Sequence, residues 1–346
     1  MLKIELLPAA HGDALLIEYG DEKSPHRVLI DGGTPGSYAR VDARLAQIGA
    51  QVDLDLLVVT HVDEDHIGGT LAQLQKNPGR LNPADVWFNG YRHLAPPDRL
   101  GAVQGETLST AIQDLGWTWN GAWNGGSVVV PDSGDLPTVT LPGGAVITLL
   151  SPTWKKLGKL VATWEKECAK VGMTPGQSAA PSDVLGRRPP PSDIDVPALL
   201  SVKFKSESSA ANGSSIAFLL EYDGKRVLLG ADAHSDVLVS SLRRLSKDPL
   251  AIDAFKVNHH ASQGNVSPAL LDALQCSRYL ISSDGSTYGH PDPEAIARIV
   301  ATPGKKSLLF NYDSEYTRPW AQAALRRKYK YTTGFADPDA PLIVEL

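Results

Sequence analysis

A cluster of histidine and aspartate residues directly after a buried strand constrains this chain more than any other feature of its sequence. The run DLDLLVVT at 53–60 is nearly continuous in apolar residues, which is typical of a strand buried on both faces. His61, Asp63, Asp65 and His66 follow it and place four nitrogen or oxygen donors within six residues. A polar turn that only caps the next helix needs one such residue, not four. The pattern therefore predicts a metal site at the end of this strand.

The composition indicates a folded globular protein without a basic binding stripe. The chain has 346 residues, of which 42% are hydrophobic and 21% are charged, and its formal net charge is −6. A dedicated duplex-binding domain normally carries a basic stripe, because phosphate neutralisation supplies much of its affinity. The densest basic segment is RRKYKY at 326–331, which we interpret as a solvated helix end. Nucleic acid stays possible as a substrate of an active site.

The same survey argues against a membrane or secreted protein. No apolar run approaches the roughly 20 residues that span a bilayer, and the first 20 residues lack the pattern of a signal peptide. Cys168 and Cys276 are too few for a disulfide framework. We therefore expect a cytoplasmic protein with no membrane partner.

Strand and helix signals alternate along most of the chain and predict two sheets covered by helices, in one domain over residues 1–346. Between about 155 and 212 the composition becomes rich in Pro, Ser and Asp, and the hydrophobic residues show no sustained periodicity. We expect a surface excursion there that controls substrate access as a lid does. Strands are expected at 3–8, 14–20, 26–33, 53–60, 84–90, 145–152, 214–232 (two strands joined by a tight turn), 255–260, 277–283 and 307–313, and helices at 37–49, after 66, around 107–115, at 237–245 and at 293–300.

Several motifs resemble the metallo-β-lactamase superfamily. THVDEDHIGG at 60–69 is similar to its signature His-x-His-x-Asp-His, with Asp63 in the place of the second histidine. The resemblance implies an α/β fold, a four-layer αβ/βα sandwich of two mixed sheets flanked by helices. KVNHHAS and YGHPDP resemble the later histidine motifs of the ComEC-like branch. The matching segments, in chain order, are HGDALLIEY at 11–19, VLIDGG at 28–33, RVLLGAD at 226–232, KVNHHAS at 256–262 and YGHPDP at 288–293.

The resemblance also implies two divalent metal ions, Zn or Mn, and their ligands. One ion would be held by His61, Asp63 and His260, the other by Asp65, His66 and His290, with Asp232 bridging them. The carboxylate of Asp63 makes the site richer in oxygen, which shifts its preference towards Mn and leaves Zn open.

Three further residues are assigned roles beside these ligands. Because adjacent strand residues point to opposite faces, only one of His259 and His260 is expected as a ligand. We favour His260 and give His259 a role in substrate binding or proton transfer, with the reverse assignment left open. Asp13 is expected to stabilise a turn, and Asp31 to orient a metal-bound histidine.

The expected function is that of a binuclear metal-dependent hydrolase. Two metal ions about 3.5–4 Å apart lower the pKa of a bridging water and stabilise charge on the attacking and leaving oxygens. A hydroxide that bridges the ions is then the nucleophile, and Asp65, Asp232 and His259 are the catalytic candidates. The favoured substrate is a phosphodiester, as for a nuclease or phosphodiesterase, with single-stranded nucleic acid or another small hydrolysable substrate as partner. A lactone, thioester or other carboxylic ester is the alternative bond, and an inactive metal-binding scaffold is the second alternative.

Overall fold

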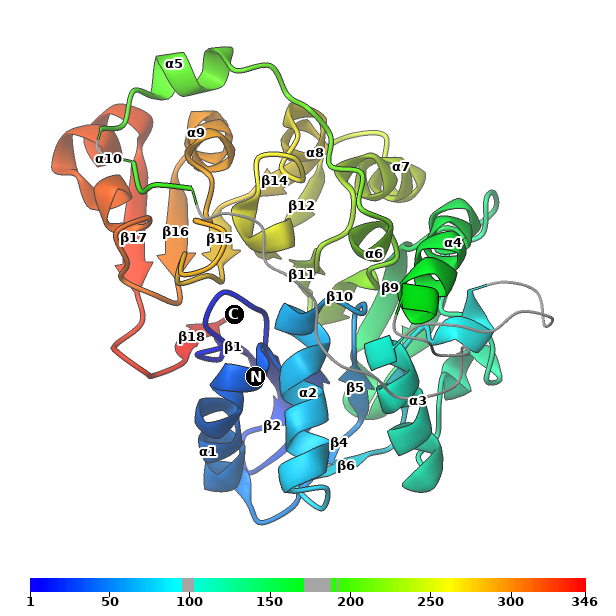
Figure 1. Ribbon diagram of the computed structural model, residues 1–346. Coiled ribbons are helices and arrows are strands. Elements are labelled where there is room, and N and C mark those ends of the chain that lie inside the picture. Colours follow the sequence, from blue (N-terminus) through cyan, green and yellow to red (C-terminus); the bar gives the residue numbers. More distant parts are fainter. Residues whose placement is uncertain (95–102, 171–187, 192) are drawn as a thin grey trace.

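Two mixed β-sheets lie face to face, with helices on the outer face of each (Figure 1). The computed structural model describes residues 1–94, 103–170, 188–191 and 193–346. One sheet has six strands in the order β18, β1, β2, β3, β5, β7, and the other has eight in the order β17, β16, β15, β13, β11, β10, β9, β8. This is the four-layer α/β arrangement that the sequence predicted. No helix of the described residues is both long and apolar enough to cross a membrane.

The six-stranded sheet combines both ends of the chain. Its outer face is covered by α1, α2 and α3, and α4 packs beside them (Figure 1). The strands are β1 (Leu2–Leu6), β2 (Leu15–Asp21), β3 (Ser24–Ile30), β5 (Leu56–Val58), β7 (Val86–Trp87) and β18 (Leu342–Glu345). The helices are α1 (Tyr38–Ile48), α2 (Glu64–Lys76), α3 (Val103–Asp114) and α4 (Trp154–Lys170).

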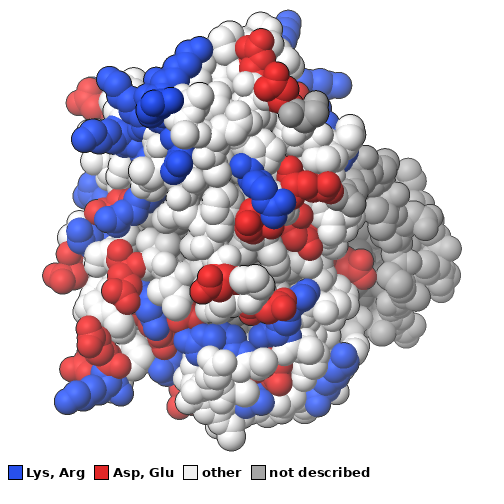
Figure 2. Space-filling model, turned by 90° about the vertical axis from the view of Figure 1, so that its left-hand side faces the viewer, with Lys and Arg blue, Asp and Glu red and all other residues white. Residues whose placement is uncertain are grey.

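The eight-stranded sheet follows in sequence and is covered by later helices. Its strands are β8 (Thr138–Thr140), β9 (Val146–Ser151), β10 (Ala217–Tyr222), β11 (Lys225–Leu229), β13 (Ala254–Lys256), β15 (Arg278–Ile281), β16 (Lys306–Phe310) and β17 (Tyr331–Phe335). The helices are α5 (Val196–Ser201), α7 (Ser235–Leu245), α8 (Pro268–Asp272), α9 (Pro293–Ala301) and α10 (Ala323–Tyr329). The short helix α6 (Ala210–Gly213) packs instead beside α4. Figure 2 shows the side of the molecule that carries α10 and β17, where Lys and Arg side chains gather towards the upper end.

Short elements complete the chain. Two small parallel sheets pair β4 with β6 and β12 with β14. These strands are β4 (Val52–Leu54), β6 (Leu81–Pro83), β12 (Leu250–Ile252) and β14 (Leu274–Cys276). The 3₁₀-helices are η1 (Pro35–Ser37), η2 (Tyr91–His93), η3 (Gly121–Trp123), η4 (Pro142–Gly144), η5 (Asn258–Ala261) and η6 (Arg318–Ala321).

Strand alternation divides the apolar core into an inner and an outer cluster. In β2, Leu15 and Ile17 face the space between the sheets, whereas Leu16 faces the helices outside the six-stranded sheet. Across the inner space, Phe218 and Leu220 of β10 belong to the same cluster as Leu15. Because successive strand residues point to opposite faces, both faces of the sheet are buried and its strand ends are held firmly. Those ends carry the site described below.

The apolar run at 53–60 forms two strands where one was expected. β4 pairs with β6 in a small sheet, while β5 pairs with β3 and β7. The break falls at Asp55, whose carboxylate accepts hydrogen bonds from the Arg27 backbone N–H (3.1 Å) and the Tyr19 hydroxyl (3.1 Å). A side chain that bonds to the neighbouring strand competes with the regular ladder. β5 itself is buried throughout, as predicted.

The excursion expected at about 155–212 begins with a helix. Leu157, Leu160 and Trp164 of α4 are buried in the outer cluster. Their spacing of three and four residues is a helical period, which the interpretation from composition overlooked. α5 and α6 lie further along the same stretch, and part of it falls outside the described residues.

The first turns of α2 lie directly on the loop that leaves β3. The Gly69 N–H donates to the Gly33 carbonyl (2.7 Å), and the Gly32 N–H donates to the His66 carbonyl (3.0 Å). A Cβ on Gly69 would lie only 1.9 Å from the Gly32 carbonyl oxygen. Only glycine therefore permits this approach, which fixes the start of α2 and with it Asp65 and His66.

Candidate metal centre

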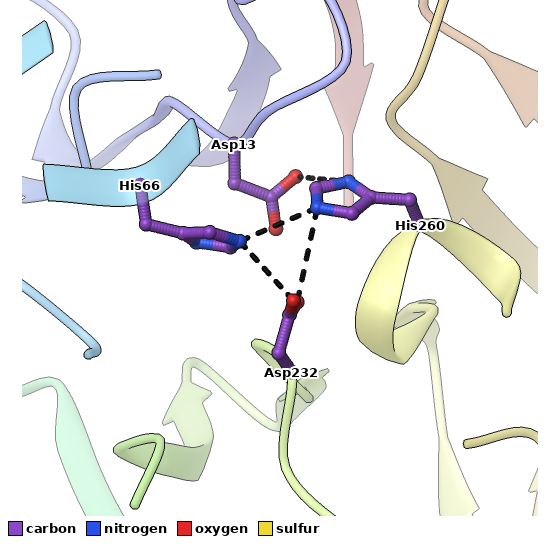
Figure 3. A group of neighbouring side chains, drawn as sticks. All are labelled: Asp13, His66, Asp232 and His260. Carbon is purple, nitrogen blue, oxygen red and sulfur yellow. Dashed lines mark hydrogen bonds and ion pairs between the residues drawn. The ribbon is translucent and has the colours of Figure 1, made fainter. Parts of the chain in front are cut away.

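The candidate centre lies where the ends of strands from both sheets meet. His61 follows β5, and Asp65 and His66 are in the first turn of α2. Asp232 follows β11, and His260 follows β13 in η5. Figure 3 shows the side chains of Asp13, His66, Asp232 and His260 pointing towards one another, and one potential ligand atom of each lies within 4.8 Å of the others.

The acidic turn after β5 brings its histidines together. The rings of His61 and His66 have centroids 4.2 Å apart. His61 Nε2 lies 3.5 Å from Asp63 Oδ2. Asp63 precedes the first residue of α2 in an extended conformation and makes no side-chain capping bond, so its carboxylate is not engaged as a helix cap. The alternative of an ordinary capping turn is therefore not supported.

Asp232 occupies the middle of the centre. Its Oδ2 lies 3.3 Å from His66 Nε2, 3.8 Å from His61 Nε2 and 3.7 Å from His259 Nε2. Its Oδ1 lies 3.9 Å from His260 Nε2. One buried carboxylate thus faces four imidazoles from both halves of the chain.

His259 and His260 both face the centre, because they do not continue a strand. β13 ends at Lys256, and His259, His260 and Ala261 have φ values of 47°, 51° and 62°. This left-handed turn replaces the strand alternation on which the sequence argument relied. His260 Nε2 lies 3.5 Å from Asp65 Oδ2, whereas His259 Nε2 approaches Asp232.

The grouping around His260 differs from the expected one. The sequence comparison placed His260 with His61 and Asp63, but the structure brings it to Asp65 and to His66, whose Nε2 lies 3.3 Å from His260 Nε2. Nδ1 of His260 bonds to the Ser282 carbonyl (2.8 Å), which leaves Nε2 directed at the centre.

His290 lies at the edge of the centre. Its ring is stacked on that of His260 at a centroid distance of 6.5 Å and lies 5.5 Å from that of His259. Among the described carboxylates, only that of Asp292 is within 4.0 Å of His290. The structure therefore does not bring His290 against Asp65 and His66, the pair with which it was expected.

Asp31 is placed behind His66. Its carboxylate accepts from His66 Nδ1 (2.8 Å), the Thr60 backbone N–H (2.8 Å) and the Thr60 hydroxyl (2.7 Å). These bonds fix the His66 ring with Nε2 towards Asp232. Both carboxylate oxygens of Asp31 are thus engaged behind His66, and its orienting role stays a prediction.

Asp13 pairs with a lysine that the sequence analysis did not single out. Lys256 is buried, and its Nζ lies 2.5 Å from Asp13 Oδ2. The other carboxylate oxygen, Oδ1, lies 3.5 Å from His260 Nδ1. Asp13 thus faces the centre and does more than stabilise a turn. A lysine inside a buried strand needs an acidic partner, and this signal in FKVNHH was available from the sequence.

The charges of the centre depend on one another. Burial alone would lower the pKa of the His66 imidazole, but the carboxylates of Asp232, Asp31 and Asp65 raise it well above its usual value. Burial would raise the pKa of Asp232, but the imidazoles of His66, His259 and His260 lower it well below its usual value. The Asp232 carboxylate therefore stays ionised although it is buried, because the imidazoles around it favour its negative charge.

These residues fit the metal ions that the sequence implied. His61 Nε2 and Asp232 Oδ1 are buried atoms without a hydrogen-bond partner among the described residues. Unpaired buried polar atoms are costly, and both are directed into the cluster. Imidazole nitrogens and carboxylate oxygens are the usual ligands of Zn and Mn. The donor set therefore suits divalent cations.

The other histidines near this region have different surroundings. Burial lowers the pKa of His93 to about 4, and its ring packs on Trp119 at 4.6 Å. His234 Nε2 pairs with Glu207 (2.8 Å). His11 Nδ1 bonds to the Thr287 hydroxyl (2.9 Å). None of these contacts places the three imidazoles in the cluster around Asp232.

One family model matches part of the chain. Residues 9–121 match the family model described as the metallo-beta-lactamase superfamily. The matched residues include Asp13 and His66 of the histidine–aspartate cluster. No curated protein matches the chain.

The solved structures that match the chain share little sequence with it. CmlA, a diiron beta-hydroxylase from Streptomyces venezuelae, is 13% identical with a TM-score of 0.44, and the match covers 100% of this chain and 54% of that one. A metallo-beta-lactamase with an HARLDQ motif from Cronobacter sakazakii is 13% identical (TM-score 0.32; 73% and 76% covered). The Rm3 metallo-beta-lactamase is 13% identical (TM-score 0.30; 75% and 80% covered). This chain thus spans about half the length of CmlA.

Proposed function

We propose that this protein is a binuclear metal-dependent hydrolase of the ComEC-like type that cleaves a phosphodiester and uses Zn or Mn. The observation that carries the proposal is the position of Asp232, whose Oδ2 lies 3.8 Å from His61 Nε2 and 3.3 Å from His66 Nε2, and whose Oδ1 lies 3.9 Å from His260 Nε2. A carboxylate in this position can bridge two cations. Donors from both sheets surround it, as a two-ion site requires.

The distances favour a particular division of the ligands. His61 and Asp63 form one group, and Asp65, His66 and His260 form the other. His259 approaches Asp232 Oδ2, the oxygen that faces both His61 and His66, so it can add a ligand to either group or meet the substrate. His290 is assigned to the edge of the site, next to His259.

The chain supplies orientation and charge for the reaction. Two bound divalent ions activate water and stabilise charge on the attacking and leaving oxygens of a displacement at phosphorus. Asp31 holds His66, and the Ser282 carbonyl holds His260, so that both imidazoles keep Nε2 towards the centre. Such supporting bonds also fix the tautomer of a ligand.

His259 is the group best placed to contact the substrate. Its side chain is 20% exposed, whereas those of His61, His66 and His260 are almost fully buried. Nδ1 lies 2.8 Å from Asn265 Oδ1, which favours a proton on Nδ1 and a free Nε2. Located at the exposed side of the centre, His259 can bind the phosphate or carry a proton to the leaving oxygen.

The first test combines metal content with turnover. Plasma mass spectrometry on the purified protein should find close to two equivalents of Mn or Zn, and the loaded protein should hydrolyse bis-p-nitrophenyl phosphate. Asp232→Ala should lose metal and turnover, while Asp248→Ala, which removes an exposed carboxylate, should retain both. Metal-free protein after reconstitution would overturn the proposal and favour the scaffold.

Assays with acyl substrates distinguish the alternative, hydrolysis of a carboxylic ester, from hydrolysis of a phosphodiester. Two metal ions together with hydrolysis of a lactone or thioester, but not of a phosphodiester, would replace the proposed substrate class and keep the metal site. Loss of that activity in Asp232→Ala would assign it to the same centre.

A further inference from the structure

A basic groove lies at the end of the eight-stranded sheet that is opposite to the metal centre. Its volume is about 610 Å³, and it is formed where β15, β16 and β17 begin and α10 ends. No acidic residue lines it, whereas the hydroxyl-bearing residues Ser277, Ser307 and Thr332 do. Its basic residues are Arg278, Lys305, Lys306, Arg326, Arg327 and Lys330.

Most of the positive charge in this basic groove has no counter-charge. Within the described residues, no carboxylate lies within 4.0 Å of any of the six basic groups. Lys306 differs from the other five because its side chain is buried and its Nζ donates to the carbonyls of Val300 and Gly304. Nε of Arg326 is buried without a hydrogen-bond partner in the described structure.

Stabilisation of a helix end does not account for the groove. Basic side chains in the last turn of α10 complement the helix dipole, and this is the interpretation that the sequence favoured for RRKYKY. Arg278 and Lys305, however, lie outside α10, at the start of β15 and before β16. Both residues line the same groove as the basic residues of α10. The groove is therefore a local concentration of positive charge in a chain whose net charge is −6. The gathering of Lys and Arg is visible at the upper end of the face in Figure 2.

We propose that the basic groove binds the phosphate backbone of single-stranded nucleic acid as an anchoring site separate from the metal centre. Unpaired Lys and Arg side chains and hydroxyl groups are the usual partners of backbone phosphates. A membrane surface fits less well, because such surfaces also insert apolar side chains and none of the exposed large hydrophobic residues of the described chain lines the groove.

The distance to the metal centre favours a flexible strand. β15 runs from Arg278 at the groove to Ile281, and the next residue, Ser282, bonds to His260. Four steps at about 3.3 Å per residue separate the two ends by roughly 13 Å. A single strand held in the groove can bend around the sheet towards the metal centre. The link to catalysis rests on the phosphodiesterase proposed above, whereas the binding does not.

The test measures binding of a fluorescein-labelled oligo-dT strand by anisotropy, with EDTA present to prevent cleavage. A groove variant, Arg278→Gln/Lys305→Gln/Arg327→Gln, should bind at least tenfold more weakly than the wild type. Its slope of log affinity against log salt should be shallower by about 2, at about 0.7 per lost phosphate contact. A control variant, Lys23→Gln/Arg243→Gln/Lys247→Gln, removes the same charge from exposed positions outside the groove and should bind like the wild type.

Further arms separate the explanations. Arg278→Lys/Arg327→Lys keeps the charge and should keep binding. All variants should hydrolyse bis-p-nitrophenyl phosphate at the wild-type rate, because this small substrate needs only the metal centre. The proposed binding site would be overturned if the groove and control variants lost affinity for oligo-dT equally. It would also be overturned if the protein bound anionic vesicles and not the oligonucleotide. A wild type that binds oligo-dT through the groove but hydrolyses no diester would overturn the proposed function alone.

Discussion

Asp31 connects backbone strain to the orientation of a histidine. Its φ of 57° lies in the left-handed region, which costs a non-glycine residue roughly 1–2 kcal/mol. The cost is offset by the three hydrogen bonds that its buried carboxylate accepts from Thr60 and His66. Strained residues of this kind persist where the surrounding structure holds them. Asp31 therefore acts on the centre through His66.

We expect Asp31→Asn to weaken Zn binding about 10- to 100-fold, the usual effect of losing such a supporting bond. Asparagine tolerates the left-handed backbone, but its NH₂ group would face either the Nδ1 proton of His66 or the donors of Thr60. Competition with a chelating dye measures the affinity. Asp53→Asn, an exposed carboxylate that accepts from Asn82, is the control. Equal affinity in all three proteins would rule out this role.

The residues of the acidic turn were predictable, and the contacts across the sheets were not. His61 follows the end of a strand, and His66 lies in the first turn of the next helix. Because both elements restrict the backbone, the spacing of the two residues alone indicated that their side chains converge. The meeting of His260 with Asp65 depends on three left-handed residues in η5. Non-glycine residues rarely adopt that conformation, and no local pattern in KVNHHAS signals it.

At the scale of elements, the contact between α2 and the loop after β3 holds the centre in place. We expect Gly69→Ala to lower the free energy of unfolding by about 1–3 kcal/mol, because its new methyl group would overlap the Gly32 carbonyl. Urea denaturation measures this. Gly79→Ala is the matched control, since a Cβ at Gly79 meets nothing within 4 Å. If both variants unfold alike, the contact is not close in solution.

Element boundaries that the sequence did not predict have side-chain causes. The break between β4 and β5 comes from the bonds of Asp55 to Arg27 and Tyr19, which lie 28 and 36 residues away. Partners at such separations leave no trace in a local hydrophobic pattern. The helix α4 is different, because Leu157, Leu160 and Trp164 carry its period openly. The helical spacing of these residues was missed because the Pro- and Ser-rich residues that follow dominate the composition of the segment.

At the scale of the whole molecule, the metal centre joins donors from the two sheets, so metal binding should stabilise the fold. A ligand that binds only the folded state adds about 2.7 kcal/mol at a hundredfold excess over its Kd. Differential scanning calorimetry should show a higher Tm with Mn or Zn than with EDTA. Asp232→Ala should lose most of the increase, while Asp248→Ala should keep it. An equal increase in both variants would place the bound metal elsewhere.

A buried ion pair also ties the two sheets together. Asp13 lies between β1 and β2 of the six-stranded sheet, and Lys256 ends β13 of the other sheet, 243 residues away. Burial would raise the pKa of Asp13, but the Lys256 ammonium lowers it. A carboxyl group whose folded pKa lies below its unfolded value stabilises the fold above about pH 4, and this contribution is lost as the pH falls towards the folded pKa.

Lys256→Met should therefore cost about 3–5 kcal/mol at neutral pH, because it leaves the Asp13 carboxylate buried and unpaired. The loss should shrink in acid, where protonation removes that charge. Asp13→Asn/Lys256→Met replaces the ion pair by neutral groups of similar size and should recover most of the stability. Urea denaturation of the wild type, both single variants and the double variant over a range of pH measures the coupling. A double variant no more stable than Lys256→Met would show that the lysine acts through packing and not through its charge.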